Sequence, residues 1–250
     1  MNVYYLSENI YLQDDKLYKN NKVIKKYDWH KKLSELGWTK LPLPLIKRLN
    51  TYSDTKYKNS QYGMLDCGQD GSCFFHCIAY ALNSNEIYKD EPYVYNSQDL
   101  RNILANSITN KLFNEIIEIY RILKGNDELY DELYDTWDPY TIKIQEFKNL
   151  ITDENNIFWG DHILIGLLMK VLNINIIIFN CNEFKNQYNI YNTMDKYDSD
   201  KKTIILIYEN ESHFKLLGHF QENNMITYFC HRNLPEEIKK IMKINVQENN

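Results

Sequence analysis

Residues 70–82 join a polar turn to an apolar helix pattern, in the order Asp-Gly-Ser-Cys-Phe-Phe-His-Cys-Ile-Ala-Tyr-Ala-Leu. Gly71 permits a tight turn, and the apolar residues after it recur at helical spacing, at positions 74, 77, 78 and 81. The change from turn to helix falls on Cys73. The sequence therefore predicts a cysteine at the first turn of a buried helix.

A cysteine at this place suits nucleophilic chemistry. It lies at the positive end of the helix dipole, among N–H groups that have no intrahelical partner. Such surroundings are expected to lower the pKa of the Cys73 thiol and to favour the thiolate. Free backbone N–H groups around Ser72 and Cys73 would be available to a developing oxyanion. The alternative interpretation is that Cys73 is a small buried hydrophobe that only packs in the core.

Length and charge restrict the class of protein. The 250 residues suit one large domain or a domain with an extension, and 44% hydrophobic residues suffice for a sizeable core. The net charge is −5 without a basic stripe, so no nucleic-acid partner is expected. The chain shows neither an apolar run near the roughly 20 residues of a membrane span nor a signal-peptide pattern. We expect a cytoplasmic protein without a membrane partner.

The five cysteines are odd in number and scattered, at positions 67, 73, 77, 181 and 230, which favours reduced thiols over a disulfide scaffold. Cys67, Cys73, His76 and Cys77 are close in sequence. However, the adjacent His76 and Cys77 would leave a helix about 100° apart, and no second ligand pair stands at zinc-finger spacing. We predict no metal site.

A cysteine nucleophile needs a base, which is usually histidine. His213 is the best placed of six histidines, because it follows residues 203–208, an apolar run typical of a buried strand. His76 is on the helix of Cys73, where its side chain is not expected to reach past the helix start. His162 is expected to be a core residue of an apolar helix. The alternative for His213 is a turn histidine without a catalytic role.

Residues 1–60 are predicted to form an N-terminal extension and residues 61–250 the main domain. The extension shows a hairpin pattern at 10–18, a strand at 22–24, a helix at 28–36 that ends at Gly37, and an extended connector at 41–44. It is expected to pack on, or to be hinged to, the main domain. In the main domain, apolar patterns predict a helix at 162–172 and strands buried on both faces at 174–179 and 203–208.

Residues 70–79 resemble the nucleophile motif of the ovarian-tumour (OTU) cysteine proteases, which reads Asp-Gly-Asn-Cys-Leu-Phe before a small apolar helix. Three further blocks resemble that family in the same order. These are Asp99-Leu100-Arg101, Trp159-Gly160 before the strand at 174–179, and the strand at 204–208 that leads to His213-Phe214. The resemblance covers roughly residues 62–220.

The resemblance implies an α/β fold of the papain superfamily, with a small central β-sheet between helical regions. It implies cleavage of isopeptide or peptide bonds after the C-terminal Gly-Gly of ubiquitin or a ubiquitin-like protein, without a cofactor. The expected partners are ubiquitin, ubiquitin-like proteins and polyubiquitin chains, and a monomer is expected. Position by position, Cys73 is the nucleophile, His213 the general base and Asp70 the acid, with the backbone near Gly71 and Ser72 at the oxyanion.

Three positions depart from the family pattern: Ser72 replaces asparagine, Phe214 replaces tyrosine, and Lys215 stands where many members carry aspartate or asparagine. Lys215 has donors only, so it cannot accept a hydrogen bond from His213 and is expected to point to solvent. Asp70 is the first choice for the acceptor that orients His213. Asn210 and Asn180, each just past a predicted strand, are the reserves.

Two other functions stay open. One is an inactive OTU fold that only binds ubiquitin, which Lys215 motivates, and the other is a cysteine protease that processes a viral polyprotein. The abundance of Asn, Lys, Ile and Tyr suggests an AT-rich genome, such as that of a large DNA virus or an intracellular bacterium. The enzyme would then act in the host cytoplasm. The extension is the expected place for a second ubiquitin surface.

Overall fold

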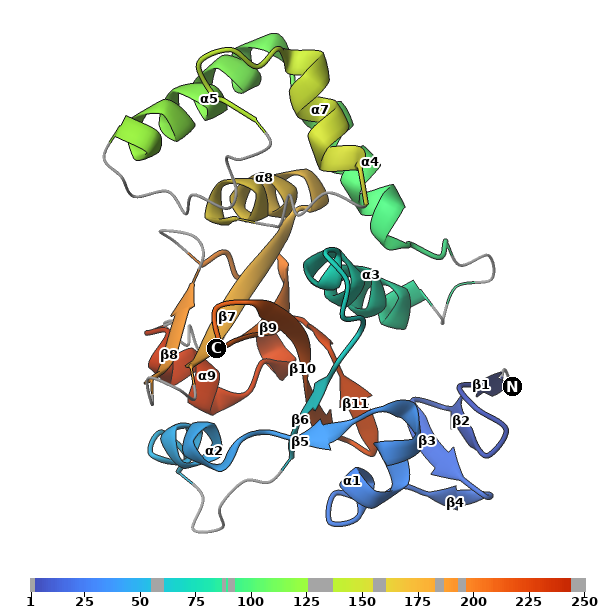
Figure 1. The fold of residues 1–250 in the computed structure, drawn as a ribbon. Helices are drawn as coiled ribbons and strands as arrows, with labels where there is room; N and C mark the ends of the chain where they lie inside the picture. The colour runs from blue at the N-terminus through green and yellow to red at the C-terminus, as the bar shows by residue number, and fades with distance from the viewer. Residues whose placement is uncertain are drawn as a thin grey trace.

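A computed structural model describes residues 3–54, 61–86, 89, 93–125, 137–154, 161–182, 187–192 and 197–243. Figure 1 shows a central sheet with helices on both faces and a smaller N-terminal sheet beside it. The strands of the small sheet are β1 (Val3–Tyr5), β2 (Ile10–Gln13), β3 (Lys16–Lys19) and β4 (Lys22–Val23). Those of the central sheet are β5 (Thr39–Lys40), β6 (Tyr62–Leu65), β7 (Ile174–Asn182), β8 (Gln187–Asn192), β9 (Lys202–Glu209), β10 (His213–Gln221), β11 (Asn224–Ile226) and β12 (Tyr228–Phe229).

Most of the helices lie between β6 and β7 in the chain. They are α1 (Trp29–Lys32), α2 (Leu43–Asn50), α3 (Cys73–Glu86), α4 (Ser97–Ser107), α5 (Asn110–Gly125), α7 (Ile144–Thr152), α8 (His162–Leu172) and α9 (Glu236–Ile241), with 3-10 turns at Leu33–Leu36 and His231–Asn233. The predicted extended connector at 41–44 is wrong in part, because α2 begins at Leu43. Pro44 lies in its first turn, where a missing N–H costs nothing.

The central sheet has the order β5-β6-β10-β9-β7-β8, with β11 paired to β10 and β12 to β9. The β7–β9 pair is parallel, and the β9–β10 and β10–β6 pairs are antiparallel. Together with the helices on its two faces, this sheet confirms the predicted α/β fold. Because β6 and β10 are antiparallel neighbours, the end of β6 lies beside the start of β10.

Alternate residues of β7 lie in two separate cores. Ile176 and Ile178 belong to the core under α3 and α8, whereas Ile177 and Phe179 belong to the core under α2 and α9. The prediction of a strand buried on both faces is therefore confirmed. The β-branched run favours this strand because such side chains pack well on a pleated surface.

Side-chain caps set where two helices begin. At α4, the Asn96 side chain accepts from the Asp99 N–H while the Asp99 side chain accepts from the Asn96 N–H. At α8, the Asp161 carboxylate accepts from the N–H groups of the second and third helical residues. His162 is the exposed first residue of α8, so its prediction as a core residue was wrong. The predicted Trp159-Gly160 block lies outside the described residues.

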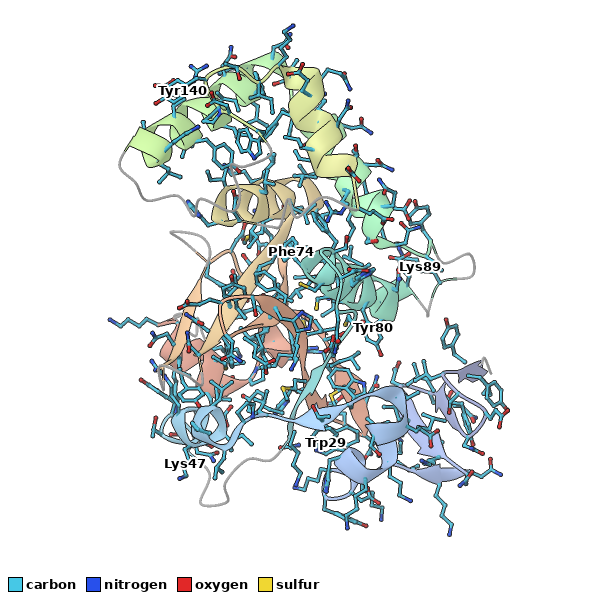
Figure 2. All side chains as sticks on the ribbon, viewed as in Figure 1. Trp29, Lys47, Phe74, Tyr80, Lys89 and Tyr140 are labelled. Atoms are coloured by element: carbon cyan, nitrogen blue, oxygen red, sulfur yellow. The ribbon has the colours of Figure 1, made fainter. Side chains whose placement is uncertain are left out.

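The N-terminal extension packs on the central sheet. The predicted hairpin and third strand are confirmed as β2, β3 and β4, and β5 pairs with β6. Trp29, which is labelled in Figure 2, is fully buried. Its ring stacks on that of Phe220 of β10, with 6.2 Å between the ring centroids. A Cβ at Gly63 of β6 would lie 2.8 Å from the Trp29 ring, so this contact requires glycine. The boundary at residue 60 stays a prediction, but the two parts share one core.

His219 of β10 makes stability depend on pH. Burial lowers the pKa of His219 to about 4 from 6.5, against the attraction of Glu237 and a hydrogen bond with Gln221. Above pH 6.5 the folded and unfolded chains both hold neutral His219. As pH falls from 6.5 to 4, only the unfolded chain takes up this proton, so stability decreases over that window. The 2.5-unit difference corresponds to about 3 kcal/mol in the free energy of unfolding.

Urea unfolding of wild type and His219→Gln between pH 7.5 and 4 measures this contribution. The wild type should lose about 3 kcal/mol more than the variant across the window. His162→Gln, which removes an exposed histidine, serves as the matched control and should keep the wild-type dependence. A His219→Gln profile parallel to the wild type would contradict the prediction.

Candidate active site

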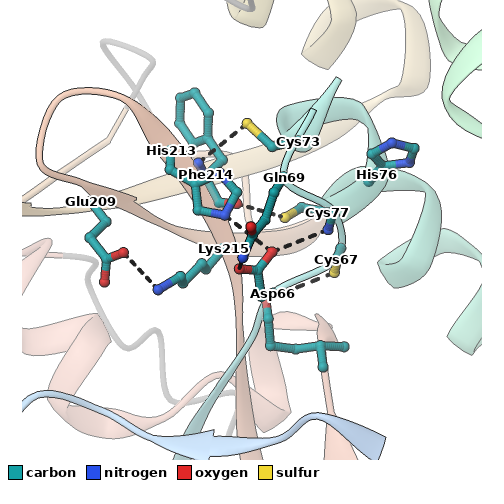
Figure 3. A network of polar contacts seen from close by, with 12 residues as sticks. Asp66, Cys67, Gln69, Cys73, His76, Cys77, Glu209, His213, Phe214 and Lys215 are labelled. Carbon is teal, nitrogen blue, oxygen red and sulfur yellow. Dashed lines mark hydrogen bonds and ion pairs between the residues drawn. The ribbon is translucent and has the colours of Figure 1, made fainter. Parts of the chain in front are cut away.

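Cys73 is the first residue of α3 and lies against the start of β10 (Figure 3). Its Sγ accepts the Phe214 N–H at 3.4 Å, and its own N–H bonds the Asp70 carbonyl at 3.2 Å. The side chain is buried, with 1% of the residue exposed. The predicted position at a helix start is confirmed, and the strand that carries His213 supplies a donor to the sulfur.

The surroundings of Cys73 favour the neutral thiol over the thiolate. Burial raises the pKa of Cys73, and the Asp70 and Asp66 carboxylates raise it further, although N–H bonds from Phe214 and Phe74 act in the opposite direction. The predicted lowering of the thiol pKa is therefore wrong for this state, because desolvation outweighs the helix start. A base must take the thiol proton before the sulfur can attack.

His213 follows a tight turn between β9 and β10. Asn210 and Glu211 occupy the left-handed region, with φ of 51° and 58°, and His213 then pairs with Glu209 across the hairpin. The His213 Nε2 lies 3.1 Å from the Asp66 Oδ1. When Nε2 carries the proton and donates to Asp66, Nδ1 is left to accept the thiol proton.

Asp66 is the first residue after β6, and its carboxylate is held from three sides. Oδ1 also accepts the Gly68 N–H at 3.2 Å, and Oδ2 accepts from the Gln69 Nε2 at 3.2 Å. Burial opposes ionisation, but the bonds from Gln69, Gly68 and His213 lower the pKa of Asp66. Asp66 is thus a fixed carboxylate acceptor for the imidazole.

Asp70 does not contact His213 in this structure. Its carboxylate accepts the Ser72 N–H at 2.8 Å and lies 3.1 Å from the His76 Nε2. The predicted pairing of Asp70 with His213 thus differs from what the structure shows. The expectation that His76 cannot reach past the helix start is also wrong, because helical side chains lean toward the N-terminus.

The loop before Cys73 carries the predicted oxyanion donors. The Ser72 N–H already bonds Asp70, so a substrate carbonyl must displace that carboxylate to use it. Within the described part of the chain, the Gly71 N–H has no hydrogen-bond partner. Gly71 and Ser72 therefore stay candidates for the oxyanion, with the Gly71 N–H the readier of the two.

Lys215 does not point freely to solvent. Its Nζ lies 2.6 Å from the Glu209 Oε2, and its side chain is 17% exposed. The Glu209 carboxylate thus partners the cation. Of the reserve acceptors, Asn210 lies in the hairpin turn and Asn180 lies within β7, and no bond joins either to His213 among the described residues.

Lys215→Ala should leave kcat/KM for a small C-terminal reporter within about threefold of wild type, because a partly exposed ion pair adds little. Glu209→Gln, which removes the other partner, is the matched variant and should behave alike. The rates follow from initial velocities of the folded proteins. A loss above tenfold for Lys215→Ala alone would show that the cation takes part in catalysis.

Sequence reasoning missed Asp66 and the Phe214 N–H. The available signal for Asp66 was an acid placed directly after the run Tyr62-Gly63-Met64-Leu65, which forms a strand beside that of His213. The signal for Phe214 was its place next to the base. Its backbone donor could not be assigned without knowing which sulfur it faces.

Among the residues that the structure describes, no cluster of three or more His, Cys, Asp or Glu side chains is placed to bind a metal ion. None of the described helices has the length and apolar character needed to cross a membrane.

The thiol lies at a helix start and accepts the N–H of Phe214, the residue after His213, and His213 contacts the Asp66 carboxylate. A thiol, a histidine and a carboxylate in this arrangement are typical of a cysteine hydrolase. The family model of OTU-like cysteine proteases matches residues 68–220, which include Cys73 and His213. The chain belongs to this family, which confirms the resemblance seen in the sequence.

Solved OTU domains are similar at low identity. The OTU deubiquitinase from Wolbachia pipientis wMel, bound to ubiquitin, is 17% identical with a TM-score of 0.42, covering 66% of this chain and 98% of its own. The OTUD1 OTU domain is 15% identical with a TM-score of 0.41, and the match covers 70% of this chain and 97% of that domain. The Hazara virus OTU bound to ubiquitin is 14% identical with a TM-score of 0.38, and the match covers 62% of this chain and 80% of that chain. No curated protein sequence matches the chain.

Proposed function

We propose that this protein is a thiol-dependent deubiquitinase. It hydrolyses isopeptide or peptide bonds after the C-terminal Gly-Gly of ubiquitin or a ubiquitin-like protein. The observation that carries the proposal is a pair of contacts made by the first two residues of β10. The Phe214 N–H contacts the Cys73 thiol, and His213 contacts the Asp66 carboxylate. The substrate class follows from the family to which the chain belongs.

Catalysis begins when the His213 Nδ1 takes the Cys73 proton, while Asp66 stabilises the imidazolium that forms. The thiolate attacks the carbonyl of the terminal glycine. N–H groups at Gly71 and, once Asp70 moves, Ser72 stabilise the oxyanion. Protonated His213 gives its proton to the leaving lysine amine. Water, activated by the same histidine, then hydrolyses the thioester bond, which releases the product with a free C-terminal carboxylate and restores the Cys73 thiol.

Ubiquitin with a thiol-reactive electrophile at its C-terminus tests the proposal. It should form a covalent adduct with the wild type, and mass spectrometry of the digest should place it on Cys73. Cys73→Ala should form none. The matched control is Cys230→Ala, which removes a partly exposed cysteine outside the site and should react as the wild type does.

The same experiment separates the other functions. Tight binding of ubiquitin without an adduct, unchanged in Cys73→Ala, would contradict a deubiquitinase and support a ubiquitin-binding module. Absence of both binding and adduct, across ubiquitin and its common relatives, would overturn the proposal. A polyprotein protease would then be shown by cleavage of a precursor from its own genome.

A further inference from the structure

Arg101 is a fully buried cation on α4, and the mechanism above does not use it. Its guanidinium carbon lies 4.5 Å from the centre of the Phe75 ring, in the first turn of α3. A buried guanidinium is costly unless its donors are satisfied. Its partners therefore indicate what the chain gains by retaining it.

All four hydrogen bonds of Arg101 end on uncharged oxygens. Nε and Nη2 donate to the Ser72 Oγ at 3.2 and 3.0 Å. Nη2 also donates to the Gly71 carbonyl at 3.1 Å, and Nη1 donates to the Ile151 carbonyl at 2.8 Å. Three of the four bonds thus hold the two residues before the nucleophile, and the fourth ties them to the end of α7.

The bond to the Gly71 carbonyl also fixes a donor direction. In a trans peptide the C=O and the next N–H point in opposite directions, so holding the Gly71 carbonyl sets where the Ser72 N–H points. Holding the Ser72 side chain fixes the residue that precedes Cys73. Gly71 and Ser72 are the residues whose N–H groups are candidates for the oxyanion.

We propose that Arg101 is a positioning residue that holds Gly71 and Ser72 in the backbone geometry required for oxyanion stabilisation. This inference rests on the proposed cysteine hydrolase function. The rigid, planar fork of arginine reaches three oxygens on two segments at once. Lysine keeps the charge but cannot reproduce that pattern, so the two side chains are not interchangeable here.

Arg101→Lys tests the proposal with the charge retained. We expect kcat on a ubiquitin C-terminal fluorogenic amide to fall about 10²-fold with KM within about threefold, as for a small misplacement of catalytic groups. Alkylation of Cys73 by iodoacetamide, followed by mass spectrometry, should stay within about threefold of wild type, because this reaction forms no oxyanion. Amide exchange at residues 71–73 should become at least tenfold faster.

Ser72→Ala is a milder second variant, because it removes the shared acceptor of two bonds and leaves the other two. Its kcat should fall less than that of Arg101→Lys. The matched control is Arg121→Lys on α5. Arg121 also donates to a backbone carbonyl, that of Pro139 at 2.9 Å, and lies near the Tyr140 ring, but outside the site. This control should keep the wild-type kcat.

Full turnover by folded Arg101→Lys would overturn the proposal. A loss of turnover matched by an equal loss of Cys73 alkylation, or by unfolding at the assay temperature, would also overturn it, since that is the effect of a general structural role. If wild type cleaves the C-terminal amide of neither ubiquitin nor its common relatives, the proposed function fails, but the exchange measurement still decides on Arg101. Unchanged exchange at residues 71–73 would then refute its positioning role.

Discussion

Asp66→Ala should lower kcat by about 10²–10⁴, because the loss of the group that orients a catalytic histidine has this effect in other triads. Asp66 is the carboxylate that His213 contacts, at 3.1 Å, and it is itself held by Gly68 and Gln69. Without it the His213 ring loses its fixed tautomer, and the imidazolium loses its counter-charge. Initial rates on a ubiquitin C-terminal fluorogenic amide, with folding checked by circular dichroism, measure the loss.

Asp70→Ala is the matched control, since it removes a second carboxylate from the same loop. The Asp70 carboxylate, which this substitution removes, contacts His76 and the Ser72 N–H and raises the pKa of the Cys73 thiol. Its loss should change kcat by less than about tenfold, an expectation for a partly exposed group without a catalytic contact. Near-wild-type turnover by Asp66→Ala, together with a large loss in Asp70→Ala, would make Asp70 the orienting acid.

Trp29→Ala should lower the free energy of unfolding by about 3–5 kcal/mol, the usual cost of emptying a buried tryptophan site. Trp29 is fully buried between the extension and the central sheet, where it contacts Phe220 and Gly63. Its removal leaves a cavity at the joint between the two parts. Urea unfolding monitored by circular dichroism measures the change.

Tyr27→Ala is the control in the same segment, because Tyr27 is 69% exposed. It should alter the free energy of unfolding by less than about 0.5 kcal/mol. Equal, small effects of the two substitutions would mean that the extension adds little to the stability of the main domain. The extension would then be a separable unit after all.

The order of the main elements could be predicted from the sequence because the patterns there are local. The helix at Cys73, the strands around 174–179 and 203–208, and the start of α8 each have their own periodicity or cap. The packing of the extension on the sheet could not be predicted from the sequence, because the Trp29–Phe220 contact links residues far apart in the chain. No short pattern marks it.

Within the candidate site, the positions of Cys73 and His213 could be predicted because each sits at the end of a strongly patterned element. The carboxylate that contacts His213 could not be predicted. Asp66 and Asp70 are four residues apart in one loop, and only the three-dimensional course of that loop places Asp66 at His213 and Asp70 at His76. The sign of the Cys73 pKa shift likewise depends on burial, which the sequence does not quantify.

The most direct test of the account is hydrolysis of a ubiquitin C-terminal fluorogenic amide by wild type, Cys73→Ala and His213→Ala. We expect turnover by wild type, with loss of at least about 10³-fold in either variant, since each removes one of the two groups between which the proton moves. All three proteins should bind ubiquitin alike. Absence of wild-type turnover, or turnover that survives in Cys73→Ala, would contradict the assignment of this chain as a cysteine-dependent deubiquitinase.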